Sequence, residues 1–272
     1  MLGLDVLFWI LRRNELDTIH LYNYLSDVMC LSTGSTMLNF GYWDDHSTTP
    51  LEAQRSLCKI FAQHTSLKPN QHIVDIGSGF GVPVSIWNNL QTSLQIHCVD
   101  INVSELKHTS NSFNQINATS TLLPFSSESV DHVFAFESAQ HFKPLNNFFS
   151  ESYRILKNDG MLSIAIPVTV DVNFCKMGIL SFTWLSEHYT KQHLLQLVQD
   201  NNFKIIDSFD IGNYVYTPMS DYYLKNEKQL WNDIKSKYPW YLKPILSTSM
   251  KKMKNLYRDG SIDYVLLYCK KI

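Results

Sequence analysis

Several features that mark particular classes of protein are scarce in this sequence of 272 residues. Cysteines are few and form no C-x-x-C pair: Cys30, Cys58, Cys98, Cys175 and Cys269. Their odd number and scattered positions argue against a structural metal and favour a reducing compartment. Neither sign of charge is in excess, since Lys and Arg total 23 and Asp and Glu total 25. The near balance excludes the basic footprint by which nucleic-acid-binding proteins hold phosphates.

Long apolar runs are also missing. The opening stretch, residues 1–11, is apolar but falls short of the roughly 20 residues that span a bilayer. No small-residue cleavage site follows it, so we expect it to pack as a helix. A weak membrane-surface contact is the alternative, and it would suit a lipid-like substrate. We therefore expect a cytoplasmic monomer or homodimer without an integral membrane segment.

The sequence does contain a short apolar run that breaks into three glycines separated by single residues, Ile73-Val74-Asp75-Ile76-Gly77-Ser78-Gly79-Phe80-Gly81. This pattern predicts a buried strand, a tight turn and a helix over 82–90, the first half of a βαβ unit. Glycine suits such a turn because a Cβ would hold a ligand away from the main chain. Some turn positions also require positive φ.

The spacing of the glycines bears on the ligand. Dinucleotide-binding folds use G-x-G-x-x-G, whereas Val82 stands here at the third glycine position. Asp75 directly precedes the glycines, where a carboxylate would repel a diphosphate but attract a sulfonium or ammonium group. A second apolar run ends at Asp100, and an acid at the tip of the second strand commonly binds ribose hydroxyls. These features predict a positively charged nucleoside ligand without phosphate and disfavour a nicotinamide oxidoreductase.

With these residues the chain resembles the class I S-adenosylmethionine-dependent methyltransferases, in the small-molecule branch of the ubiquinone, sterol and polyketide type. The resemblance covers about residues 36–210 and implies a Rossmann-like, seven-stranded, mainly parallel sheet. Five motifs carry it in the family's order: Asp75-Ile-Gly77-Ser-Gly79-Phe-Gly81, Val99-Asp100-Ile101, Leu123-Pro124-Phe125 with Ser129-Val130-Asp131, Phe136-Glu137-Ser138-Ala139-Gln140-His141-Phe142, and Glu151-Ser-Tyr-Arg154-Ile-Leu-Lys157-Asn-Asp-Gly160.

The resemblance implies S-adenosyl-L-methionine as the cofactor. In open α/β sheets the ligand lies outside the carboxyl ends of the strands, where strand order reverses. Many relatives use an Asp-Ala pair before "LPF" to bind adenine, whereas this chain has Asn117-Ala118-Thr119-Ser120, whose amide or hydroxyl can take that role. The residues that we assign to cofactor binding are Asp75, Gly77, Ser78, Gly79, Gly81, Asp100, Ile101, Asn117, Ala118, Thr119 and Glu137.

Alternating strand and helix patterns indicate a doubly wound α/β sheet with right-handed crossovers in a single domain. Residues 1–65 are expected to form a helical N-terminal cap, 66–210 and 260–272 the core, and 211–259 a helical lid insertion. The second helix, capped by Ser104, and the third strand are expected to be short. The other predicted strands are 73–76, 94–99, 131–136, 161–166, 203–209 and 262–269. The other predicted helices are 51–65, 82–90, 145–156 and 186–201.

Two aromatic segments are candidates for the acceptor site. Residues 37–44 gather aromatics around Gly41 and resemble the "L-x-x-G-Y-W" stretch that folds over cofactor and substrate in small-molecule methyltransferases. We assign Tyr42 and Trp43 to substrate binding, with an ordinary aromatic anchor as the alternative. The Tyr- and Trp-rich insertion at 211–259 is the second candidate, since it is too long for a simple connection.

The chemistry of transfer depends on orientation and on a base. A sulfonium is already an activated electrophile, so the enzyme must mainly align the acceptor, and a hydroxyl acceptor must also lose its proton. His141 is our candidate base and substrate contact, because imidazole titrates near neutrality and lies just after the fourth strand. Alternatively, His141 only positions the substrate; His20, His46 and His188 are weaker candidate bases. Glu137 is a candidate to orient His141 or the cofactor's amino group.

We therefore expect O-methylation of a small, apolar or aromatic acceptor. Carbon methylation of a quinone, sterol, lipid or polyketide-like ring is the nearest alternative, and nitrogen methylation comes third. A non-catalytic relative that only binds the cofactor is a further alternative, kept open by the altered adenine segment.

Overall fold

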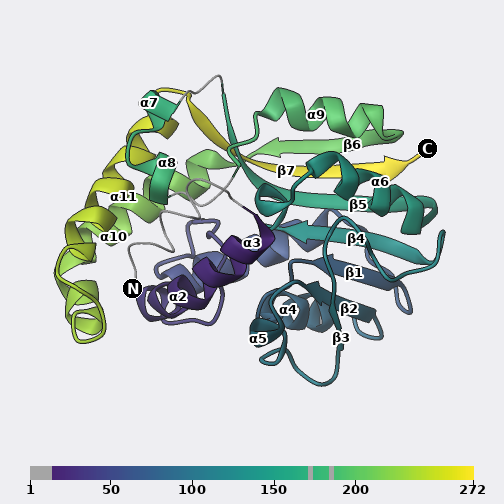
Figure 1. The fold of residues 1–272 in the computed structure, drawn as a ribbon, viewed down its shortest axis with the longest axis horizontal. Coiled ribbons are helices and arrows are strands. Elements are labelled where there is room, and N and C mark those ends of the chain that lie inside the picture. The colour runs from purple at the N-terminus through teal and green to yellow at the C-terminus, as the bar shows by residue number, and fades with distance from the viewer. Residues whose placement is uncertain (1–13, 171–173, 184–186) are drawn as a thin grey trace.

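The computed structural model describes residues 14–170, 174–183 and 187–272. Residues 1–11, for which we predict a packed helix, lie outside the described residues. Figure 1 shows a single twisted sheet with helices on both faces. No helix in the described part of the chain is long and apolar enough to cross a bilayer.

The sheet has seven strands in the order β3-β2-β1-β4-β5-β7-β6. Strands β1 to β5 run parallel to one another, and β7 runs antiparallel to both β5 and β6. This topology confirms the predicted doubly wound, mainly parallel sheet. The strands are β1 (His72–Ile76), β2 (Gln95–Asp100), β3 (Asn114–Asn117), β4 (Val130–Phe136), β5 (Leu156–Thr169), β6 (Phe203–Asp210) and β7 (Ile262–Lys271).

The described helices agree with most of the predicted ones, with two corrections. The helix predicted over 186–201 begins only at Lys191, because the Thr190 side chain accepts from the His193 N–H and caps it. The short helix after β2 is capped by Asn102, which accepts from the Ser104 N–H, and not by Ser104. The helices are α2 (Glu15–Thr33), α3 (Pro50–Gln63), α4 (Val82–Leu90), α5 (Val103–Leu106), the 3-10 turn η1 (Ala139–His141), α6 (Leu145–Ile155), α7 (Phe174–Met177), α8 (Leu180–Thr183), α9 (Lys191–Asp200), α10 (Gly212–Ile234) and α11 (Leu242–Arg258).

The core is divided by the sheet into two layers. Along β4, Phe134 and Phe136 point to the layer covered by α3 and α4, where the Phe61 ring lies 5.2 Å and 5.0 Å from theirs. Val133 and Ala135 alternate onto the opposite layer, which α6 and α9 cover. Because successive side chains of a strand point to opposite faces, this apolar run fills both layers. A fully buried aromatic ring contributes about 1.5–3 kcal/mol.

Helices α10 and α11 lie at one end of the molecule, packed on each other, and α10 also contacts α2 (Figure 1). In the chain they lie between the two antiparallel strands β6 and β7, since α10 begins just after β6 and α11 ends just before β7. Residues 211–259 therefore form a helical hairpin beside the carboxyl ends of the strands. The division of the chain into cap, core and lid stays a prediction.

Candidate active site

The site lies where the strand order reverses. β1 has β2 on one side and β4 on the other, so the loops after these three strands diverge and leave a crevice between them. The loop after β1 carries the glycines, β2 ends at Asp100, and the loop after β4 carries Glu137 and His141. We call the cavity in this crevice the glycine-loop cavity; its volume is about 120 Å³.

The first two glycines are required by backbone conformation and by close packing. Gly77 and Gly79 have φ of 75° and 51°, in the left-handed region that favours glycine. A Cβ added at Gly77 would lie 2.3 Å from the Ser138 Cβ. Ser138 in turn donates to the Ile76 carbonyl oxygen at 2.5 Å. The bare backbone of the loop is therefore pressed against the end of β4, and it lines the glycine-loop cavity.

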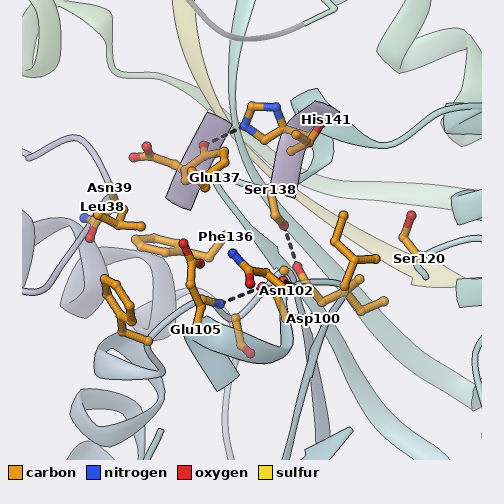
Figure 2. Close-up of a pocket in the computed structure, with 18 of the residues that line it drawn as sticks. Leu38, Asn39, Asp100, Asn102, Glu105, Ser120, Phe136, Glu137, Ser138 and His141 are labelled. Carbon is orange, nitrogen blue, oxygen red and sulfur yellow. Dashed lines mark hydrogen bonds between the residues drawn. The ribbon is translucent and has the colours of Figure 1, made fainter. Parts of the chain in front are cut away.

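Asp100 ties this loop to the end of β2. Its two carboxylate oxygens accept from the Gly79 N–H and the Asn102 N–H, each at 2.8 Å. Burial raises the pKa of Asp100, and these hydrogen bonds oppose the rise. Figure 2 shows Asp100 and Asn102 on one side of the cavity, with Glu137 and His141 across from them. Gly79 and Asp100, which belong to two separate motifs of the sequence, are thus in direct contact at one edge of the sheet.

The structure brings most of the predicted cofactor-binding residues to the wall of the glycine-loop cavity. Those that line it are Gly77, Ser78, Gly79, Asp100, Ile101, Ala118 and Glu137. Four others do not, and each has a different role. Gly81 begins α4 with φ of 69°, and a Cβ there would lie 2.6 Å from Thr109 Cγ2. Its role is thus close packing.

The other three departures concern polar side chains. Asp75 is only 2% exposed inside β1, and burial followed by the nearby Asp100 raises its pKa to about 8. It is thus protonated at neutral pH, contrary to the expectation that it presents a negative charge to the ligand. Asn117 donates to the carbonyl oxygens of Asp100 and Ile101, at 2.9 Å and 3.0 Å, and so joins β3 to β2. Thr119 donates to Glu15.

Helix α2 forms one wall of the glycine-loop cavity, to which it contributes Glu15, Thr18, Ile19 and Tyr22. One face of α2 is joined to the loops that follow β2, β3 and β4 by side-chain hydrogen bonds. The pairs are Glu15 with Thr119, Tyr22 with His141 (2.8 Å), Asn23 with Asn102 (3.0 Å) and Ser26 with Glu105 (3.0 Å). No local pattern in the sequence indicates that these side chains contact distant loops, and our sequence reasoning missed the contacts.

Glu105 is a second residue that sequence reasoning missed. It lies in α5, lines the glycine-loop cavity and accepts from the Ser26 hydroxyl. Burial, followed by the charge of Asp100, raises its pKa to about 7, and the hydrogen bond from Ser26 opposes the rise. Its place one turn after the acid at the end of β2 is the signal that could have pointed to it.

Glu137 holds the segment after α2 against the end of β4. Its φ of 55° is unusual for a residue with a side chain, and such strain often marks functional sites. The Phe40 N–H donates to both oxygens of the Glu137 carboxyl group at 2.9 Å, and the Tyr264 hydroxyl donates to Oε1 at 2.6 Å. Burial raises its pKa to about 8, against the effect of these hydrogen bonds. Glu137 therefore anchors the wall of the site.

His141 ends η1, where its Nε2 lies 2.8 Å from the Tyr22 hydroxyl oxygen. The two rings meet edge to face, with centroids 5.4 Å apart. Burial lowers the pKa of His141 to about 4, so the imidazole is neutral at neutral pH. The other candidate bases, His20, His46 and His188, line neither of the two cavities described here.

A second cavity, of about 300 Å³, lies between α2, the segment 38–43, α10 and α11; we call it the α10–α11 cavity. Its wall is mainly apolar, with Met219, Leu230, Trp231 and Met250 from the two C-terminal helices. Both cavities are lined by the same five residues at their common wall, namely Tyr22, Leu38, Asn39, Glu137 and His141. The arrangement provides two binding spaces that meet at His141.

The two residues assigned to the acceptor differ in position. Trp43 lines the α10–α11 cavity and packs near the Tyr222 ring, with centroids 5.3 Å apart. Tyr42 lines neither cavity, because its ring stacks on Tyr214 at 4.4 Å. Only one of the pair can therefore face the acceptor space.

The glycine-loop cavity fits S-adenosylmethionine. Gly77 and Gly79 leave their backbone open to a ligand, and Asp100 can accept further hydrogen bonds from ribose hydroxyls. Apolar side chains for the adenine face come from Phe80, Val82 and Ile101. Among the described residues that line this cavity, none is Lys or Arg and four are acidic, namely Glu15, Asp100, Glu105 and Glu137, so the lining does not favour a diphosphate.

The sequence has relatives among methyltransferases. Residues 74–164 match the family model described as a methyltransferase domain. Erythromycin 3''-O-methyltransferase of Saccharopolyspora erythraea is 24% identical over 230 residues, which are 75% of this chain and 74% of that protein. (+)-O-methylkolavelool synthase of Herpetosiphon aurantiacus is 22% identical over 250 residues, which are 85% of each chain.

The fold also has relatives among solved structures. One is geranyl diphosphate C-methyltransferase of Streptomyces coelicolor A3(2) in complex with Mg²⁺, geranyl diphosphate and S-adenosyl-L-homocysteine. It has a TM-score of 0.75 and 14% identity, and the match covers 95% of this chain and 98% of that one. This likeness shows that the two chains share a fold. The methyltransferase-domain match over residues 74–164 and the named sequence relatives support an S-adenosylmethionine-dependent methyltransferase of small molecules.

Proposed function

We propose that the protein methylates a hydroxyl oxygen of a small, apolar or aromatic acceptor bound in the α10–α11 cavity. The observation that carries the proposal is the position of His141 at the wall common to both cavities. A group there can touch an acceptor on one side while the methyl donor lies on the other. Trp43 and the apolar side chains of α10 and α11 supply the surface for the body of the acceptor.

His141 is suited to remove the proton. When bound, S-adenosylmethionine supplies a methyl group on a sulfonium, and the thioether that leaves needs no protonation. The acceptor hydroxyl must lose its proton as its oxygen gains the methyl group. Burial lowers the pKa of His141 to about 4, so the imidazole is neutral in the neutral range but is a weaker base than the near-neutral histidine that the sequence predicts. It can take the proton as methyl transfer makes the hydroxyl acidic, whereas the buried phenol of Tyr22, whose pKa is raised, keeps its own. For the base to be Nδ1, the Nε2–H of His141 must donate to the Tyr22 hydroxyl oxygen, and in that tautomer the hydrogen bond fixes the imidazole in place while Nδ1 takes the proton.

Oxygen is favoured over carbon and nitrogen by the sequence relatives, two of which are named for O-methylation. The second candidate is carbon methylation, because a structural neighbour is named as a C-methyltransferase. That reaction also needs a base, so His141 is consistent with either. The identity of the methylated atom distinguishes them.

The test is a transfer assay on the full chain with methyl-labelled S-adenosylmethionine. The acceptors are hydroxylated terpenoids, macrolides and phenols, each paired with its deoxy analogue, and mass spectrometry locates the added methyl. We expect label on oxygen, and we expect His141→Asn to lower kcat/KM by roughly 10²–10⁴. His46→Asn, an exposed position outside both cavities, is the matched control. Label on carbon or nitrogen, or full activity of His141→Asn, contradicts the proposal.

We also propose that the protein is cytoplasmic and that residues 211–259 act as a lid over the acceptor. The support for the lid is that α10 and α11 line the α10–α11 cavity without forming part of the sheet. Hydrogen exchange with and without a bound acceptor tests it. A true lid gains protection in α10 and α11 when the acceptor binds, and unchanged exchange there contradicts the role.

A further inference from the structure

Charge is distributed unevenly between the helical hairpin of residues 211–259 and the rest of the chain. The hairpin holds nine of the 23 basic residues but only four of the 25 acidic ones, so its net charge is +5. The remaining residues together carry −7, and the whole chain therefore has a net charge of only −2. A negatively charged surface attracts the hairpin and repels the remainder, so it orients the molecule with the hairpin toward it.

The outer half of the hairpin carries most of this excess. Five lysines lie within nineteen positions of the chain, namely Lys225, Lys228, Lys235, Lys237 and Lys243. The first three are exposed, and their spacings of three and seven residues place them on one face of α10. Lys237 is exposed in the turn that joins α10 to α11. The basic side chains therefore form a stripe that runs to the end of the hairpin.

Few acidic groups oppose these lysines. Between positions 225 and 243 the acidic residues are Glu227 and Asp233. Glu227 lines the α10–α11 cavity, where its carboxyl group accepts from the Ser247 hydroxyl. Asp233 is thus left as the acidic side chain on the outer surface of this part of the hairpin, where it is exposed.

Two aromatic side chains are exposed among the lysines. Trp240 is 78% exposed and Tyr241 is 45% exposed, and their ring centroids lie 6.2 Å apart. Both belong to the turn between α10 and α11, which Figure 1 shows at the outer end of the hairpin, away from the sheet. We call residues 235–243 the hairpin tip. Trp and Tyr favour the boundary between water and hydrocarbon, because their rings are apolar while the N–H or O–H group stays hydrated.

The hairpin tip adjoins the space proposed for the acceptor. Ile234 directly precedes the tip and Lys243 ends it, and both line the α10–α11 cavity. Leu230 and Trp231, one turn earlier on α10, continue the apolar wall. A surface that contacts the tip therefore lies next to the apolar cavity.

We propose that the hairpin tip docks on a lipid bilayer that contains anionic lipids. The lysines interact with the negative headgroups, and the rings of Trp240 and Tyr241 enter the interfacial region. Lysines alone would suit any polyanion, whereas exposed aromatic rings among them favour a surface that is both negative and apolar. This inference goes beyond the proposed function, since it assigns a second surface of the protein and a bilayer as its partner.

The test is flotation of the full chain with vesicles of phosphatidylcholine, either pure or with about one-third phosphatidylserine. We expect the serine-containing vesicles to bind the protein at least tenfold more tightly at about 0.1 M NaCl. Raising the salt to about 1 M shortens the Debye length from about 10 Å to about 3 Å and should remove most of this difference. Equal binding to both vesicles, or no binding to the anionic ones, overturns the proposal.

Two double variants examine the two components of the tip. Lys235→Gln with Lys237→Gln should weaken binding to anionic vesicles roughly tenfold or more, because each lysine near such a surface contributes about fivefold. Trp240→Ser with Tyr241→Ser should weaken it by a similar factor. All four side chains lie outside both cavities, so affinity for S-adenosylhomocysteine should stay as in wild type and report correct folding.

Matched controls make the same exchanges outside the hairpin. Lys59→Gln with Lys204→Gln removes two exposed lysines, and Leu122→Ser removes an apolar side chain that is 73% exposed. Both controls should bind anionic vesicles as wild type does. If the aromatic variant binds like wild type, the tip is a purely electrostatic surface, as for an acidic protein, and bilayer docking is overturned. Undiminished binding by the lysine variant also overturns it, because the contact then lies elsewhere.

The readout is vesicle binding, so it is independent of methyl transfer. Binding through the tip without any transfer would sink the proposed reaction and leave this inference in place. Transfer to a dissolved acceptor by a protein that does not float with vesicles would do the reverse.

Discussion

The hydroxyl oxygen of Tyr22 and Nε2 of His141 lie 2.8 Å apart, although 119 positions separate the two residues in the sequence. Tyr22 belongs to α2, and His141 ends the turn after β4. The hydrogen bond joins the helix that borders both cavities to the group that we propose as the base. The orientation of the imidazole therefore depends on a helix outside the sheet.

The first prediction concerns this bond. Tyr22→Phe removes the hydroxyl but keeps the ring, so we expect kcat to fall roughly five- to tenfold, in line with a net hydrogen bond of about 1 kcal/mol. Affinity for S-adenosylhomocysteine should stay within about twofold. Tyr42→Phe, which alters a tyrosine outside both cavities, should leave both quantities unchanged. An unchanged kcat in Tyr22→Phe would remove the positioning role from this hydrogen bond.

The second prediction concerns the pH dependence of catalysis. Because burial lowers the pKa of His141 to about 4, the base is in its active, neutral form throughout the neutral range. At saturating cofactor, kcat should decline on the acid side with a midpoint near pH 4. Saturation matters because Glu105, with a pKa of about 7, lines the glycine-loop cavity and can alter cofactor binding. An acid limb centred near 6.5 would contradict the assignment of the buried His141 as the titrating base.

A third prediction links burial to acid stability through His132, which is 3% exposed on β4. Burial lowers its pKa to about 4, from 6.5 in the unfolded chain. Between these values the unfolded state binds a proton that the folded state does not, so stability falls as pH decreases from 6.5 to 4 and then levels off. The loss amounts to about 3 kcal/mol at most. Urea unfolding of wild type and His132→Gln at pH 7 and pH 4.5 should show a smaller loss in the variant; equal losses would refute the assignment.

A fourth prediction separates strain from crowding at the glycine loop. Gly77→Ala places a Cβ 2.3 Å from that of Ser138 and adds it to a residue with positive φ. We expect a loss of about 3 kcal/mol in the free energy of unfolding, and weaker binding of S-adenosylhomocysteine. Gly260→Ala has a similar φ with nothing within 4 Å of the added Cβ, and should cost only about 1 kcal/mol. Equal losses in the two variants would mean that packing against Ser138 matters little.

A fifth prediction concerns the carboxylate that holds the loop. Asp100→Asn keeps one acceptor oxygen but loses the charge that accepts from Gly79 and Asn102, so affinity for S-adenosylhomocysteine should fall tenfold or more. Asp131→Asn is the matched control, because Asp131 accepts from the His72 N–H and pairs with Lys157, outside both cavities. Its cofactor affinity should not change. Calorimetry measures both variants.

Most of the sheet could be predicted from the sequence, because its central strands are short apolar runs bounded by glycine or polar turns. The order of the motifs along the chain also indicated which strand ends meet. The orientation of individual side chains was harder to predict. In β1 both faces are buried, so the apolar pattern could not show that Asp75 faces the interior and not the ligand.

The polar contacts of α2 were beyond the reach of sequence reasoning for a different reason. Ser26 and Asn23 have no local pattern that distinguishes them from other polar residues of a surface helix. Their partners, Glu105 and Asn102, come from a separate part of the chain and are brought near only by the fold. The same holds for Tyr22, whose partner His141 is 119 positions away in the sequence.

The wall common to the two cavities has a consequence for how such an enzyme can diversify. A change at Tyr22, Leu38, Asn39, Glu137 or His141 alters both binding spaces at once. By contrast, Met219, Leu230, Trp231 and Met250 border the α10–α11 cavity alone. A library that randomises these four helix positions can therefore explore new acceptors while the methyl-donor half of the enzyme remains as it is.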